Sequence, residues 1–343
     1  MAPSTDVPVN GQYKGSQAFA HILPLEKESI NTNTGSLNYS QTLVKLRGIQ
    51  KSVDLTLSIN YSDDLLGTFG FPANWGFDLP YVLPGKSATF QQRTYAIDKE
   101  WSDTVGYKSG LRYLNDHGTR FQQVSPSKLP SEKPGKYSYL LQCTDGAAFY
   151  FDSFGKLLEQ DDIFGNRICY KYVGGEDGTV LTKALASIED SWHQSITFKY
   201  ATGSPGMPYG GVTITLPNET STTVRFDKGG VRSIIDPADQ KTTFTYQAGQ
   251  PIISEITYPT GLQSLFEYTD IEFRDTNGRS GHKAAVVKNV KRDKADGTTY
   301  ERTTYGYGML SKGHTYTGFQ IGCQLGGLQD SLMDGHAGSA NYL

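Results

Sequence analysis

Short runs of alternating apolar and polar residues, separated by turn-forming residues, recur along much of the chain. Residues 150–172, YFDSFGKLLEQDDIFGNRICYKY, hold such runs on both sides of a turn that contains Asp and Gly. Apolar residues at every second position indicate strands, and Asp and Gly favour the tight turns that join them. No long stretch has the apolar spacing of a helix, so the pattern predicts a β-hairpin here and an all-β fold overall.

This hairpin pattern repeats in a frame of eleven residues, with an aromatic residue at the ninth position and Tyr at the last. The four copies begin and end at Asp162 and Tyr172, Asp190 and Tyr200, Asp236 and Tyr246, and Tyr258 and Tyr268. A looser fifth copy runs from Val287 to Tyr305 or Tyr307. Because one hairpin cannot bury its aromatic face alone, we expect the copies to stack into one continuous sheet.

The first residue of the frame is expected to shape each turn. An Asp carboxylate accepts hydrogen bonds from N–H groups of the turn that follows it. We therefore predict that Asp162, Asp190 and Asp236 cap hairpin turns, and that the aromatic residues of the returning strand share one buried face. Because neighbours on a strand point to opposite faces, Asp161 and Asp162 do not form a paired acid and base.

Composition and charge narrow the classes of partner. The chain of 343 residues has 38 Gly, 22 Tyr and 16 Phe but only 4 Met, as is typical of strands and tight turns. The net charge of −3, with both signs mixed, argues against nucleic acid as a partner. No apolar run is long enough to span a bilayer. Residues 1–16 lack the features of a secretory signal peptide, so we expect a flexible leader and synthesis in the cytoplasm, with any secretion by a signal-peptide-independent route.

Several stretches resemble the YD-repeat family of Rhs proteins, which includes bacterial Rhs toxins, the B and C components of insecticidal Tc toxins, and teneurins. The likeness lies first in YFDSFGKLLEQDDIFGN and VRFDKGGVRSIIDPADQKTTFTY. Upstream, INTNTGSLNYSQTLVKL, LTLSINYS and GTFGFPANWGFDLP are similar to the lead-in of Rhs proteins. YGYGMLSKGHTYTGFQIG resembles a stretch that follows their first repeats, so the likeness extends over residues 17–343.

The resemblance implies YD-repeat hairpins that form a large curled, shell-like sheet. It divides the chain into the leader at 1–16, an N-terminal β region with a plug-like segment at 17–142, the YD-repeat sheet at 143–310, and a Gly-rich, truncated β segment at 311–343. It also implies a non-catalytic wall that encapsulates a C-terminal toxin domain, with the rest of the shell and a secretion machine as partners. The family cleaves itself near an Asp-Pro-x-Gly motif, whereas Asp236-Pro237 lacks the Gly and lies within a repeat.

Residues that could carry chemistry are sparse. No two of the six histidines lie at metal-ligand spacing, and no nucleophile elbow, phosphate-binding loop or zinc-protease helix is present. Cys143, Cys169 and Cys323 match no zinc or disulfide pattern, so we expect free thiols. We predict no catalytic residue, no metal site and no cofactor. Ca²⁺ at the Asp turns, Cys323 as a nucleophile, and a hydrolase or self-cleaving protease remain as alternatives.

The three tryptophans raise a second functional alternative. Trp75, in PANWGFDLP, is interpreted first as part of a plug that seals the N-terminal end of the sheet. Alternatively, Trp75, Trp101 and Trp192 form an aromatic platform that stacks on a glycan or a partner protein. The plug requires Trp75 to be buried, whereas the platform requires the three rings to be exposed on one face.

Overall fold

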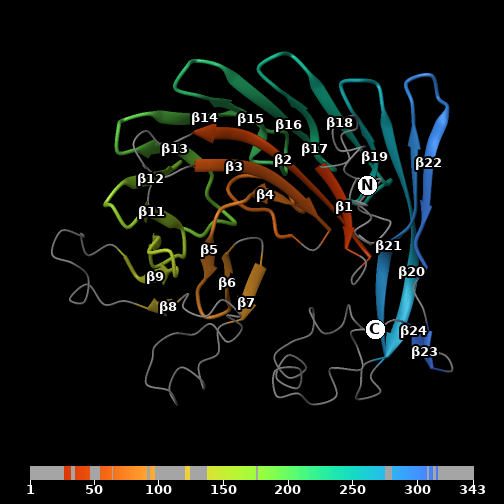
Figure 1. Ribbon diagram of the computed structural model, residues 1–343, viewed down its shortest axis with the longest axis horizontal. Coiled ribbons are helices and arrows are strands. Elements are labelled where there is room, and N and C mark those ends of the chain that lie inside the picture. Colours follow the sequence, from red (N-terminus) through yellow and green to blue (C-terminus); the bar gives the residue numbers. More distant parts are fainter. Residues whose placement is uncertain are drawn as a thin grey trace, which may run out of the picture.

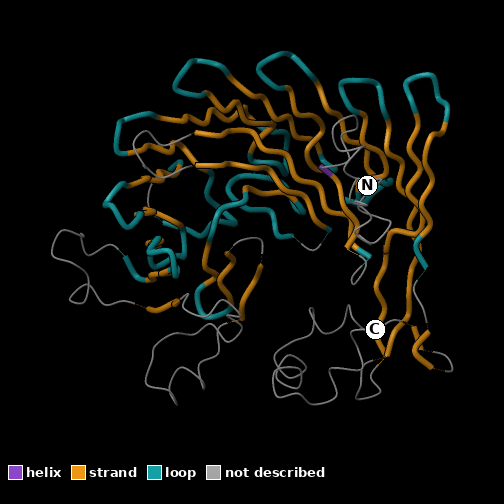
Figure 2. Tube along the Cα trace, in the orientation of Figure 1, coloured by secondary structure: helices purple, strands orange, loops and turns teal. Residues whose placement is uncertain are grey.

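The structure is a computed structural model, and the residues that it describes include most of the predicted sheet. The described residues are 27–31, 35–46, 55–63, 65–90, 93–96, 120–123, 137–174, 177–274, 280–306, 309–311 and 314–315. Strands and turns make up nearly all of them (Figure 2), which confirms the predicted all-β fold. Within this part of the chain, no helix is long and apolar enough to cross a membrane. The predicted leader, Trp101 and Cys323 lie outside the described residues.

Two small antiparallel sheets form the N-terminal part. The first has the order β1 (Glu28–Asn31), β2 (Ser36–Leu46), β3 (Leu55–Ser62) and β4 (Trp75–Phe77). The second has the order β5 (Tyr81–Leu83), β6 (Ser87–Phe90) and β7 (Arg93–Ala96). In both sheets, strands that are consecutive in the chain pair with each other.

One large antiparallel sheet follows, in which each strand pairs with the next along the chain. Its strands are β8 (Arg120–Gln123), β9 (Tyr139–Gln142), β10 (Ala148–Phe151), β11 (Leu157–Asp161), β12 (Arg167–Tyr172), β13 (Leu185–Asp190), β14 (Ser195–Thr202), β15 (Tyr209–Thr215), β16 (Ser221–Asp227), β17 (Gly230–Ile235), β18 (Lys241–Tyr246), β19 (Ile253–Thr257), β20 (Gln263–Arg274), β21 (Ser280–Asp293) and β22 (Thr299–Thr304). The short hairpin of β23 (Met309–Ser311) and β24 (His314–Thr315) joins through a parallel bridge from β24 to β20. Two strands before residue 143, β8 and β9, thus belong to this sheet.

The large sheet curls into an arc, and the N-terminal sheets lie on its concave side (Figure 1). Its end strands β8 and β22 are not paired with each other among the described residues, so the arc is open. β-Bulges occur beside three of the repeat tyrosines, at Lys171/Tyr172, Thr245/Tyr246 and Glu267/Tyr268. Because a bulge bends a strand and increases its twist, a bulge in each of these repeats curls the whole sheet.

The hydrophobic core lies between the arc and the N-terminal sheets. The ninth residues of the four repeats are all buried: Tyr170, Phe198, Phe244 and Phe266. They belong to the same core cluster as Leu57, Ile59 and Trp75 from the N-terminal strands. The aromatic face that a single hairpin cannot cover is therefore buried by stacking along the sheet and by the layer placed inside it.

Candidate functional site

Asp162, Asp190 and Asp236 shape three hairpin turns in the same way. In each turn, the Asp Oδ1 atom accepts hydrogen bonds of 2.8–2.9 Å from the backbone N–H groups two and four residues further on. For Asp162, burial raises the pKa of the carboxyl, but hydrogen bonds from the Asn166 side chain and from turn N–H groups outweigh it and lower that pKa. The turns have the bonding expected for a capping Asp, and no described metal-binding group surrounds them.

The same backbone turn recurs seven times along one edge of the described sheet. In each turn the N–H of the first residue bonds to the carbonyl four residues on, and the N–H of the fourth residue bonds back to the carbonyl of the first. The fourth residue always has a positive φ angle: Gly146, Gly165, His193, Glu219, Asp239, Gly261 and Gly297. This is the hairpin turn that ends in a left-handed residue. The sequence frame found four of these turns, and the fifth copy contains the turn at Gly297.

A tyrosine hydroxyl joins neighbouring strands in every repeat. Tyr172, Tyr246 and Tyr268 each donate a hydrogen bond of 2.6–2.8 Å to the carbonyl of the residue fifteen positions upstream. Tyr200 donates to the Phe69 carbonyl at 3.3 Å and also has a contact with the backbone of Leu185, its own upstream residue. Burial raises the pKa of all four phenols, so each stays a protonated donor. These bonds lock one strand of the arc to the next.

Trp75 joins the N-terminal layer to one of these repeat tyrosines. Its indole Nε1 donates a 3.0 Å hydrogen bond to the Tyr246 hydroxyl, which itself donates to the Val231 carbonyl. The indole ring lies 5.0 Å from the Phe244 ring and 5.2 Å from the Tyr61 ring, measured between centroids. The side chain is fully buried. Because the Trp75 ring has no exposed surface, it cannot stack on a ligand, and the platform alternative is wrong for Trp75. Its buried position fits the plug interpretation.

The other two tryptophans differ from Trp75. Trp101 lies outside the described residues, so the platform alternative can be compared with the structure only at Trp75 and Trp192. Trp192 is 55% exposed at the tip of the β13–β14 turn. Ile163 and Phe164, at the tip of the β11–β12 turn, are also exposed. The Ser191 hydroxyl joins the two hairpins by accepting a 2.6 Å hydrogen bond from the Arg167 N–H, so the exposed tips belong to neighbouring turns.

A buried carboxylate fixes the first strand to the far end of the arc. The Glu28 carboxylate accepts hydrogen bonds of 2.9 Å from the Tyr258 and Ser264 hydroxyls. It also pairs with the Arg292 guanidinium at 3.0 Å, and Arg292 contacts Glu301 on its other side. The pKa of Tyr258 is raised by burial and by the nearby Glu28 charge. This node was not predicted, because its residues lie up to 264 positions apart in the sequence.

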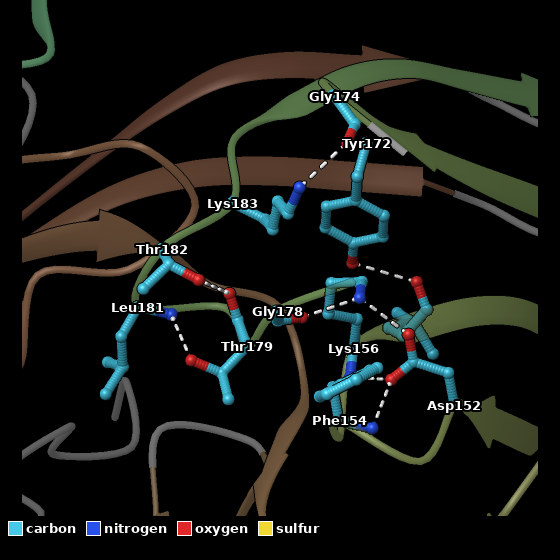
Figure 3. A network of polar contacts seen from close by, with 11 residues as sticks. Asp152, Phe154, Lys156, Tyr172, Gly174, Gly178, Thr179, Leu181, Thr182 and Lys183 are labelled. Carbon is cyan, nitrogen blue, oxygen red and sulfur yellow. Dashed lines mark hydrogen bonds and ion pairs between the residues drawn. The ribbon is translucent and has the colours of Figure 1, made fainter. Parts of the chain in front are cut away.

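A second buried charge lies in the turn between β10 and β11, whose Gly155 carbonyl accepts a hydrogen bond from the Val82 N–H of β5. Figure 3 shows the polar contacts around it. Lys156 Nζ lies 2.7 Å from Asp152 Oδ2 and donates a 2.6 Å hydrogen bond to the Gly178 carbonyl. Its ammonium also lies 5.0 Å and 5.7 Å from the ring centroids of Phe154 and Tyr172. Asp152 Oδ1 accepts from the turn N–H groups of Phe154 and Lys156, as in the repeat turns. The FDSFG stretch carries this Asp, but its ion pair has no sequence signal.

The chemistry-bearing residues remain dispersed in the described part of the chain. No group of three His, Cys, Asp or Glu residues there could hold a metal ion. Cys143 and Cys169 are partly exposed and form no disulfide in the described part of the chain, which does not include Cys323. His193 lies exposed in its turn, with Nδ1 2.9 Å from Glu189 Oε1. In these positions the Cys and His side chains contribute to packing and to turns.

Comparisons with known proteins give a structural likeness only. No known family model matches the chain, and no curated protein matches its sequence. Among solved structures, the chain is similar to a crystal structure of TcdB2-TccC3, with 10% identity and a TM-score of 0.32 over 83% of this chain and 17% of that chain. A TcdB2-TccC3 structure without the hypervariable C-terminal region gives 12% identity and a TM-score of 0.33, over 83% of this chain and 16% of the other. The chain thus spans about a sixth of the length of these proteins, and TM-scores this low assign no function.

Proposed function

We propose that this chain is a non-catalytic wall segment of an Rhs-type shell, whose curled YD-repeat sheet holds polypeptide on its concave side. The observation that supports the proposal is that side chains of the repeats form hydrogen bonds with the chain's own N-terminal strands on that side. Tyr246 accepts the hydrogen bond of Trp75, and Tyr258 donates to Glu28. Both contacts lie between the repeat sheet and the N-terminal layer that occupies the inside of the arc (Figure 1).

The way the wall is built supports the partners that we propose. In three repeats the same tyrosine–carbonyl contact joins the two strands of a hairpin. Neighbouring hairpins pair with each other through antiparallel backbone hydrogen bonds, so further hairpins can extend the wall by the same pairing. Edge strands β8 and β22 each have one pairing in the described sheet. The proposed partners are the rest of the shell, a toxin domain enclosed by it, and a machine that exports the assembly from the cytoplasm.

The test uses the protein made from the complete natural reading frame that contains this chain. We expect electron cryomicroscopy to show a hollow particle whose curled sheet encloses additional polypeptide. We also expect trypsin to spare that polypeptide until urea unfolds the wall. A solid particle, in which the concave face contacts only β1–β7, would overturn the enclosing role.

Two matched variants test whether the contact between Trp75 and Tyr246 holds the N-terminal layer on the wall. Tyr246→Phe removes the hydroxyl that receives Trp75, whereas Thr245→Ala changes an exposed side chain on the same strand. Protease sensitivity of the N-terminal layer should rise in the first variant and stay unchanged in the second. For the catalytic alternative, intact mass after long incubation decides, because self-cleavage converts the full-length mass into two fragments.

A further inference from the structure

Two neighbouring hairpin turns at one rim of the large sheet present large apolar side chains to solvent. Ile163 and Phe164 form the tip of the β11–β12 turn and are 62% and 63% exposed. Trp192 stands at the tip of the β13–β14 turn and is 55% exposed. The Ser191 hydroxyl accepts a hydrogen bond from the Arg167 N–H and donates one of 3.1 Å to the Arg167 carbonyl, so the two turns are held side by side.

The turn itself does not require these apolar side chains. The seven turns of this rim share one backbone form, and the second and third residues of each turn make its tip. Small or polar residues form the other five tips: Thr144 and Asp145, Pro217 and Asn218, Pro237 and Ala238, Pro259 and Thr260, and Ala295 and Asp296. Those residues close the same turn with the same backbone bonds. Ile163, Phe164 and Trp192 are therefore needed neither for the turn nor for the core, which does not include them.

The Ile163 side chain leans over a glycine in the next turn. Its Cγ2 atom occupies the place that a Cβ atom would take at Gly146, the fourth residue of the β9–β10 turn. The apolar surface therefore extends over three neighbouring turns, all of which are built on paired strands. A surface on such a rigid support loses little conformational freedom when a partner binds, which favours binding.

Carboxylates border the apolar tips. Residues 161–167 and 189–195 contain one arginine and one histidine against four acidic side chains, which are Asp161, Asp162, Glu189 and Asp190. Further from the tips, Glu159 and Lys171 add one charge of each sign. The surroundings of the apolar tips are therefore negatively charged, and a surface that carries Lys and Arg complements them.

Exposed aromatic residues with charged neighbours have the composition of a protein–protein interface. Aromatic side chains are enriched at the centre of such interfaces, and polar residues surround them. A lipid surface fits less well, because Asp190 stands two residues from Trp192 and anionic headgroups would repel its carboxylate. We propose that the tips of the β11–β12 and β13–β14 turns bind a partner protein whose contact surface is apolar at its centre and basic at its rim. This docking surface is separate from the wall function, and either can hold without the other.

The experiment measures binding of two synthetic amphipathic helices to the purified full chain. Both peptides have the same Leu-rich face, and the polar face carries Lys in one peptide and Glu in the other. Fluorescence anisotropy of the labelled peptides gives the affinities. We expect the Lys peptide to bind with a Kd of roughly 10–100 μM and the Glu peptide to bind at least about tenfold more weakly. Added NaCl should weaken the Lys peptide, because salt screens exposed charges.

A double variant and a matched control locate the binding surface. Phe164→Ser combined with Trp192→Ser should weaken the Lys peptide at least about tenfold, as expected for aromatic residues at the centre of an interface. Its melting temperature should stay that of the wild type, because both side chains are exposed. Leu66→Ser is the control, since Leu66 is 51% exposed but lies in the loop between β3 and β4. Its affinity should stay within about twofold of the wild type.

Several results would overturn the proposal. They are no binding of the Lys peptide at about 1 mM, equal affinities for the two peptides, and unchanged binding in the double variant. Phosphatidylcholine vesicles that bind the wild type but not the double variant, with neither peptide bound, would show a lipid surface instead. A dimer in sedimentation velocity that the double variant abolishes would show a second copy of the chain instead. None of these outcomes affects the wall function, which the protease test with Tyr246→Phe decides.

Discussion

The indole Nε1 of Trp75 lies 3.0 Å from the hydroxyl oxygen of Tyr246, although 171 positions separate the two residues in the chain. The Tyr246 hydroxyl in turn donates a 2.7 Å hydrogen bond to the Val231 carbonyl. One phenol therefore links the N-terminal layer, the β18 strand and the β17 strand. The repeat tyrosine therefore joins two strands of the large sheet and also holds the N-terminal layer against that sheet.

Replacing Tyr246 by Phe should cost more than the same change at Tyr268. At Tyr246 the loss leaves the Trp75 N–H and the Val231 carbonyl without the hydroxyl, and each unpaired buried polar group costs about 1–3 kcal/mol. At Tyr268 the corresponding bond goes to the Ile253 carbonyl alone. Urea unfolding followed by tryptophan fluorescence measures both variants. Equal losses of stability would show that the Trp75 contact contributes nothing.

Turn capping at Asp236 should matter less than packing at Phe244. Asp236→Ala removes two N–H contacts in an exposed turn and should lower stability by about 0.5–2 kcal/mol. Phe244→Ala empties a buried site between the Tyr39 and Trp75 rings and should cost about 3–5 kcal/mol. Urea melts of the two variants give the order. The reverse order, or an activity lost from a folded Asp236→Ala protein, would make this Asp a functional ligand.

The turn at Asp162 should stabilise the protein in a pH-dependent way. Its folded pKa is lowered from the usual 3.8, because hydrogen bonds to the turn outweigh burial. A lowered folded pKa stabilises the protein above the unfolded pKa, and the contribution is lost as pH falls through the folded pKa. The stability difference between wild type and Asp162→Ala should therefore be larger at pH 7 than at pH 2. A difference that stays constant in urea melts across this range would contradict the charge-assisted turn.

The Glu28 node should hold the first strand in place. Glu28→Gln leaves the mostly buried Arg292 with Glu301 as its one remaining ionic partner among the described residues, and breaking a buried pair typically costs about 3–5 kcal/mol. Because Glu301 is more exposed and remains, we expect the lower part of that range. Adding Arg292→Met should recover part of the loss, since it removes the uncompensated charge. A double variant that is less stable than Glu28→Gln would contradict this assignment.

Two lysines near the β12–β13 connection provide a matched comparison (Figure 3). Lys156 is buried and pairs with Asp152, whereas Lys183 reaches the Gly174 carbonyl from a more exposed position. Lys156→Met should destabilise the protein strongly, because it strands a carboxylate that is mostly buried. Lys183→Met should change stability by less than about 1 kcal/mol. Thermal unfolding by circular dichroism checks the order, and similar effects would show that the Lys156 ion pair adds nothing.

The sequence determined the parts of the fold that depend on neighbouring residues. The alternation of apolar residues specified the strands, and Asp190 or Asp236 specified each turn because an Asp carboxylate reaches N–H groups two and four residues away. The burial of the aromatic ninth residue also follows from local period-two geometry. The turn that ends with Glu219 at positive φ escaped the frame, because Leu216 stands at its first position and Phe226, not Tyr, stands at the eleventh.

Only the tertiary structure decided which distant residues meet. Trp75 has the same aromatic character whether it is a plug or an exposed platform, and the curl of the sheet places it against Tyr246. Glu28 finds Arg292 because the first strand crosses to the far end of the arc. Such contacts depend on the accumulated twist and bulges of many strands, and no local pattern of residues encodes that sum.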